Sequence, residues 1–99
     1  MICYQVNLQV LDTSRNEELL NWLRRHIDEM LQFDGFERAQ LMLDIESNPS
    51  NFISIEYFVK DRQKLEDYFN NHTSKMRQEG INLFSGTFEA SRRILFVSE

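Results

Sequence analysis

The sequence of 99 residues is poor in the residues that mark common catalytic and binding motifs. It has a single cysteine, Cys3, so an intrachain disulfide is impossible and a reducing compartment is favoured. Its three glycines are scattered, which excludes a glycine-rich phosphate-binding loop. No GxSxG motif is present, and no His or Cys pair has the spacing of metal ligands. We therefore expect neither a metal nor a bound cofactor.

The chain also lacks long apolar runs and an excess of positive charge. No segment is apolar over the length of a membrane span, and Gln5, Asn7 and Gln9 interrupt the first apolar segment, unlike a signal peptide. The net charge of −5 disfavours binding to nucleic-acid phosphates and to anionic lipid. The basic and aromatic signature of an RNA-recognition strand is absent as well. These features predict a cytoplasmic protein with no nucleic-acid or membrane partner.

Four segments have the composition and period-two alternation of β-strands. They cover residues 2–11, 36–47, 52–60 and 84–97. The first and third have the most regular pattern, and we predict that they are the central strands. The alternation fails at Leu95 and Val97, so we expect the end of the last strand to be buried on both faces.

Two segments between these strands carry apolar residues at helical spacing. The first predicted helix covers 14–31 and begins at a capping box formed by Ser14 and Glu17. The second covers 62–79 and ends at Gly80. The buried stripe of the second helix is predicted to contain Leu65, Tyr68, Phe69, His72 and Met76.

The predicted order is β-α-β-β-α-β, and no repeat or linker suggests a second domain within residues 1–99. Two βαβ units with right-handed crossovers form a four-stranded antiparallel sheet in the order 4-1-3-2. Both helices then cover one face. This is the α+β fold called ferredoxin-like.

The uncovered face of this sheet mixes polar and apolar side chains. Its predicted members are Cys3, Gln5, Asn7, Gln9, Gln40, Met42, Phe52, Ser54, Glu56, Phe58, Thr87, Ser91 and Arg93. A solvated face would carry more charge, and a core face would carry no Gln, Asn or Glu. We therefore predict a homodimer that packs sheet against sheet and encloses a pocket for a small molecule. The alternative is a solvated sheet with scattered aromatic residues.

Glu56 and Arg93 are the charged residues of this predicted pocket. Arg93 would bind the carboxylate or phosphate of a ligand, or form a salt bridge with Glu56 in the dimer. Glu56 would act as a base in a partly dry cavity, or form an ion pair. Gln5 and Asn7 supply polar groups beside them, so these four residues are candidate ligand-binding residues. Arg92 has the opposite parity to Arg93 and is predicted to point to the other face.

The two histidines, His26 and His72, lie near the ends of the two helical stripes. They are interpreted either as an acid/base pair or metal site, or as surface or core-edge histidines; the second interpretation is favoured because ligand spacing is absent. Cys3 has no neighbouring catalytic signature and is predicted to be a structural thiol. The catalytic residues, if any, stay unassigned.

A set of spaced residues resembles a group of short, uncharacterised bacterial proteins that are classed as a domain of unknown function. The residues that carry this resemblance are Trp22, His26, Ile27, Gly35, Phe36, Tyr57, Leu65, Tyr68, His72, Met76, Arg77 and Arg92. The resemblance spans the chain and implies a fold similar to the dimeric α/β barrels, with no established activity. It adds His72 and Arg77 to the candidate ligand-binding residues.

Two functions of different class follow. The first is a homodimeric ligand-binding or interaction module that uses the open sheet face and performs no chemistry. The alternative is a small cofactor-independent enzyme of the dimeric α/β-barrel kind, such as an oxygenase, isomerase or decarboxylase, acting on an aromatic or acidic substrate. The second rests on analogy of fold, and one fold hosts many functions.

Overall fold

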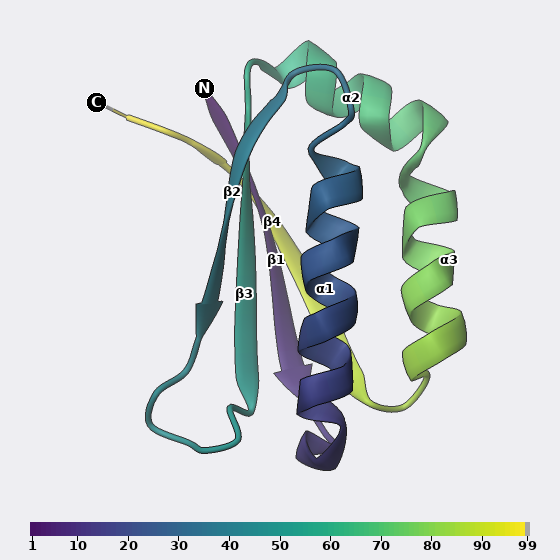
Figure 1. Ribbon diagram of the computed structural model, residues 1–99. Helices are drawn as coiled ribbons and strands as arrows, with labels where there is room; N and C mark the ends of the chain where they lie inside the picture. The colour runs from purple at the N-terminus through teal and green to yellow at the C-terminus, as the bar shows by residue number, and fades with distance from the viewer. Residues whose placement is uncertain (99) are drawn as a thin grey trace.

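The computed structural model describes residues 1–98. Its elements are β1 (Ile2–Val10), the 3-10 turn η1 (Thr13–Arg15), α1 (Asn16–Met30), β2 (Phe36–Leu43), β3 (Phe52–Val59), α2 (Arg62–Asn71), α3 (Thr73–Phe84) and β4 (Phe88–Phe96). Figure 1 shows the three α-helices on one face of the sheet, with the other face open. Within these residues, no helix is long and apolar enough to cross a membrane.

The four strands form one antiparallel sheet in the order β2-β3-β1-β4. Read from the other edge this order is 4-1-3-2, so the predicted ferredoxin-like topology is confirmed. β1 and β3 are the central strands, as predicted from their regular alternation. In this register Gln5 of β1 lies opposite Glu56 of β3 on one side and Arg93 of β4 on the other.

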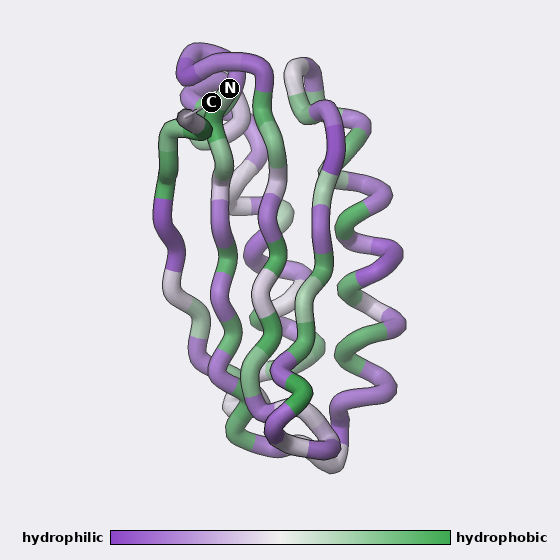
Figure 2. The backbone as a smooth tube through the Cα atoms, turned by 90° about the vertical axis from the view of Figure 1, so that its left-hand side faces the viewer, coloured by the Kyte–Doolittle hydropathy of each residue, from purple (hydrophilic) through white to green (hydrophobic). Residues whose placement is uncertain are grey.

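The core lies between the sheet and the helices. Figure 2 shows hydrophilic and hydrophobic residues following one another along the strands. The apolar set packs in one core cluster with residues of the helices. Ile53, Ile55, Tyr57 and Val59 of β3 are each at most 2% exposed. Burial of one such side chain contributes about 1.5–3 kcal/mol, so the core is the main stabilising element of the fold.

The predicted second helix, 62–79, is wrong in its extent. The chain forms two helices there, and the break is at His72, whose φ of −133° is not helical. Gly80 does not end a helix: it is buried inside α3, which continues to Phe84. A glycine is needed at this position because of tertiary packing: a Cβ atom at Gly80 would lie 3.1 Å from the ring of Trp22 on α1. The glycine thus allows α1 and α3 to approach each other closely.

The capping box predicted at Ser14 and Glu17 is also wrong. The carboxylate of Asp12 accepts a hydrogen bond from the Ser14 amide at 3.1 Å and caps η1 instead. α1 then begins at Asn16 without a side-chain cap. The side chain of an aspartate can accept a hydrogen bond from the backbone amide two residues later, and this local turn competes with the capping box as the start of the helix.

Two predicted strands are shorter than expected. β2 ends at Leu43, because the Asp44 carboxylate accepts a hydrogen bond from the Glu46 amide at 2.9 Å and turns the chain. β4 begins at Phe88, so Phe84 belongs to α3. The expected burial of the last strand on both faces is wrong for a single copy of the chain, since Leu95 is 39% exposed.

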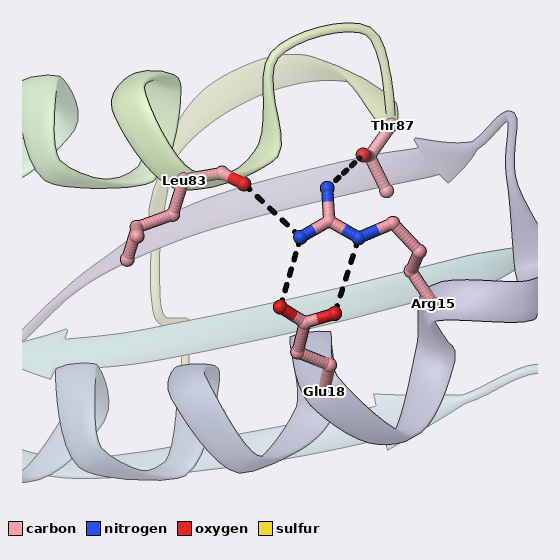
Figure 3. Close-up of polar contacts among 4 residues, drawn as sticks. All are labelled: Arg15, Glu18, Leu83 and Thr87. Atoms are coloured by element: carbon pink, nitrogen blue, oxygen red, sulfur yellow. Dashed lines mark hydrogen bonds and ion pairs between the residues drawn. The ribbon is translucent and has the colours of Figure 1, made fainter.

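Arg15 joins the start of α1 to the end of α3 (Figure 3). Its guanidinium donates to the carbonyl oxygen of Leu83 and to the hydroxyl of Thr87, both at 3.1 Å. The same group forms a bidentate pair with Glu18 at 2.9 and 3.2 Å. Thr87, which we predicted on the open sheet face, is buried in the turn before β4. These contacts hold the two helices in position at one end of the core.

Candidate functional site

A cavity lies on the helix side of the sheet, not on the open face. Its volume is about 410 Å³, and residues of all three α-helices and of β1, β3 and β4 line it. Most of the wall is apolar, including Leu23, Met30, Ile55 and Met76. Small-molecule sites in proteins are concave, mostly apolar and of this size, so this cavity is the candidate functional site.

Trp22 and His26 form one wall of the cavity. They lie one turn apart on α1, and their rings stack with centroids 4.6 Å apart. The indole nitrogen of Trp22 donates to the carboxylate of Glu79 at 3.4 Å. Burial lowers the pKa of His26, and the nearby Glu79 carboxylate opposes that effect. The imidazole is therefore neutral at neutral pH and can accept a proton.

Two arginines reach the same cavity from different elements. Arg77 comes from α3, and its guanidinium donates to the Tyr4 hydroxyl at 3.2 Å. Arg92 comes from β4. Burial raises the pKa of Tyr68, while Arg77 and Arg92 both lower it. Arg92 lies opposite Val6, two residues from Tyr4 on the same face of the sheet, so both arginines line the cavity on the side of Tyr4.

Two buried nitrogen atoms of the cavity residues lack a partner within the described protein. They are the Nδ1 atom of His26 and the Nε atom of Arg77. Buried polar atoms in folded proteins are almost always hydrogen-bonded, so each exception calls for an explanation. Each nitrogen is covered by surrounding protein atoms, so neither faces the open space of the cavity.

Four of the predicted site residues meet on the open face, where they form a continuous hydrogen-bonded chain. Arg93 donates to the amide oxygen of Gln5 at 3.1 Å, and Gln5 donates to Glu56 at 3.0 Å. Asn7 also donates to Gln5, at 3.1 Å, and accepts from Ser54 at 2.8 Å. Gln5 thus bridges Glu56 and Arg93. This arrangement orders the polar residues in the middle of the sheet face.

The remainder of the open face combines apolar side chains with a buried thiol. Met42, Phe52 and Leu95 are each 39% exposed. Cys3 is 4% exposed, and burial, together with the charge and hydrogen bond of Glu56, raises its pKa to about 11. It is buried, as expected of a structural thiol. The open face is thus polar along its centre and apolar toward its edges.

The structure separates the remaining two predicted site residues from this group. Arg77 lies in the helix-side cavity, on the opposite side of the sheet from Arg93. His72 is exposed at the break between α2 and α3, where its ring stacks on Phe33 with centroids 4.4 Å apart. The predicted burial of His72 in the helical stripe is therefore wrong.

Sequence reasoning did not assign Tyr4, Arg92 or the His26 ring to one cavity. The signal for Arg92 was present, because it has the opposite parity to Arg93 and the structure confirms that the two point to opposite faces. For His26, no motif or residue spacing in the sequence indicated a place in a cavity. Residues 1–98 contain no group of three His, Cys, Asp or Glu side chains placed to hold a metal ion.

Several proteins of known structure have the same fold as this chain. A proposed antibiotic biosynthesis monooxygenase from Deinococcus radiodurans has a TM-score of 0.79 at 11% sequence identity, covering 100% of this chain and 94% of the other. A mutant form of SnoaB, a cofactor-independent oxygenase from Streptomyces nogalater, has a TM-score of 0.74 at 9% identity, covering 99% and 93%. A conserved protein from Methanosarcina mazei Go1 has a TM-score of 0.72 at 16% identity, covering 96% and 91%. These similarities establish a shared ferredoxin-like fold.

The chain belongs to the family described as Domain of unknown function (DUF4286), whose profile matches residues 1–98. The resemblance seen in the sequence is therefore confirmed. No curated protein sequence matches the chain. Family membership thus brings no activity with it, and the function has to be argued from the site.

Proposed function

We propose that this protein is a homodimer that binds a small organic molecule in the helix-side cavity. The observation that carries the proposal is the convergence of His26, Arg77 and Arg92 on one largely apolar cavity of about 410 Å³. An apolar wall with a few convergent polar groups is the usual design of a ligand site. This proposal moves the ligand from the open sheet face, where we first expected it, to the helix side.

The open sheet face is proposed as the contact between the two copies. Its exposed Met42, Phe52 and Leu95 would be covered by the same face of a partner. The ordered chain through Gln5 and Glu56 would then lie at the centre of the contact, with these two side chains already hydrogen-bonded to each other. A chain of this length gains stability from such additional burial. The proposal retains the cytoplasmic location expected from the sequence.

Native mass spectrometry of the protein purified from cells tests both parts. We expect a dimer with an additional non-protein mass. Ala90 lines the cavity from β4 and is exposed, so Ala90→Phe should fill the cavity and remove the additional mass. Gln78→Phe, on the exposed side of α3, is the matched control and should retain it. A bare monomer at tens of micromolar would refute the proposal.

A second candidate is a cofactor-independent oxygenase, and the neutral His26 in an aromatic cavity favours it. His26 would take the proton of a phenol or enol substrate, and a carbon atom of the resulting anion would bond to dioxygen, the oxidant, to form a hydroperoxide; its O–O bond would then break with loss of water, leaving one oxygen atom in the product as a carbonyl group. The shared fold with SnoaB is consistent with this function but does not establish it. Oxygen uptake with a panel of hydroquinones, in wild type and in His26→Gln, tests it. Uptake that is unchanged in the variant would exclude this role for His26.

A further inference from the structure

The charge around the cavity indicates what kind of molecule would bind there. The protein has a net charge of −5, and within residues 1–98 three of its eleven Lys and Arg residues, Arg15, Arg62 and Lys64, form ion pairs with acidic side chains. Among residues 1–98, no carboxylate forms an ion pair with Arg77 or Arg92. The hydrogen bond of Arg77 goes to a neutral hydroxyl instead. The cavity therefore holds two cations without a counter-charge.

These two cations converge on one place. Arg77 donates to the Tyr4 hydroxyl, and Arg92 lies opposite Val6, two residues from Tyr4 on the same face of the sheet. Tyr68 of α2 lines the same cavity and adds a second hydroxyl. Two guanidinium groups that line one cavity repel each other, and an anion bound between them removes this repulsion. Guanidinium groups bind carboxylates with well-defined geometry.

The other walls of the cavity favour a ligand with a flat, apolar ring system. The Trp22 ring forms one wall, and the absence of a side chain at Gly80 allows that ring to lie against α3. Met30, Met76 and Ile81 also line the cavity. Aromatic and thioether side chains pack well against planar ligands. A free phosphate or another small polar anion would leave these walls uncovered.

We infer that the ligand is an aromatic monocarboxylic acid whose carboxylate binds between Arg77 and Arg92 and whose ring system packs against Trp22. This inference rests on the proposed function and specifies the class of its ligand. Arg77 is the only one of the six residues singled out from the sequence that contacts this ligand. Arg92, which the sequence analysis did not include among them, has an equal role.

Calorimetric titration of the full chain with 2-naphthoate and with its neutral analogue 2-naphthamide tests the inference. We expect naphthoate to bind at least about 10-fold more tightly, because only the anion pairs with the two arginines. Arg77→Gln and Arg92→Gln should each weaken naphthoate binding by about 10-fold and leave naphthamide binding unchanged. Retained naphthamide binding also shows that the variants are folded. The control Arg25→Gln makes the same charge change at an exposed position of α1 and should have no effect.

Trp22 is the only tryptophan of the chain, so its indole N–H signal in a proton–nitrogen NMR spectrum locates the bound probe. We expect naphthoate to shift that signal. Equal binding of the two probes, without an effect of the arginine variants, overturns the inference while the proposed function stands. A copurified molecule that is neutral overturns it as well. The absence of both probe binding and a copurified molecule refutes the proposed function together with this inference.

Discussion

The single thiol offers a direct test of the environment on the open sheet face. Burial, with Glu56 as the next contribution, raises the pKa of Cys3 from an ordinary 9.0 to about 11. Because the thiolate is the reactive form, its fraction at pH 8 falls from about 9% to about 0.1%. The less acidic thiolate is also the stronger nucleophile, which offsets about 6–10-fold of this loss, so we expect the native protein to react with a chromogenic disulfide reagent about 10-fold more slowly than an exposed thiol. The 4% exposure of Cys3 slows the reaction further.

The same protein unfolded in urea is the control, since the same thiol should then react at the ordinary rate. Glu56→Gln keeps the shape of the side chain and removes its charge, so it should lower the pKa of Cys3 and speed the native reaction. Glu29→Gln, at an exposed position of α1, should not. If two copies cover this face, labelling will slow further as protein concentration rises. Equal rates in native and unfolded protein would refute the reasoning.

Two further predictions concern stability. Gly35 and Gly86 both have positive φ, +87° and +78°, but a Cβ at Gly35 would lie 2.5 Å from side-chain atoms of Lys64, whereas one at Gly86 would contact nothing. Gly86→Ala should therefore lower the free energy of unfolding in urea by about 1–2 kcal/mol, because of backbone strain. Gly35→Ala should lower it by about 1–3 kcal/mol more, because the added methyl group also overlaps Lys64. Equal losses in the two variants would contradict this reasoning. Burial lowers the pKa of His26, and the Glu79 carboxylate opposes this effect only in part. Just below pH 6.5 the unfolded chain therefore binds more protons than the folded chain does. Wild-type stability should therefore be complete above pH 6.5 and fall as the pH decreases toward the lowered pKa. His26→Gln should flatten this dependence, and urea titrations at about pH 7.5 and 5.5 that show the same slope for both proteins would contradict it.

Much of the fold could be predicted from local patterns. The alternation in 52–60 identified a central strand because a strand with one buried face must repeat every second residue. The order of strands and helices then left few topologies, since βαβ crossovers are right-handed. The same parity argument placed Arg92 and Arg93 on opposite faces, which the structure confirms. Errors arose where local signals competed, as at Asp12 and Ser14.

The location of the site could not be predicted in the same way. Gly80 carries the local signal of a helix end, yet it lies inside α3 because the distant Trp22 ring requires the space that a side chain would occupy. Likewise His26, Arg77 and Arg92 are far apart in the sequence, and only the packing of α1 and α3 on the sheet brings them to one cavity.

The sequence by itself determined the strands, the ferredoxin-like topology and the polar character of the open face, because these follow from periodicity and chirality along the chain. The tertiary structure decided which face holds the cavity and which arginines share it. Distances between helices depend on how side chains from different elements interdigitate, and this packing has no periodic signature in the sequence.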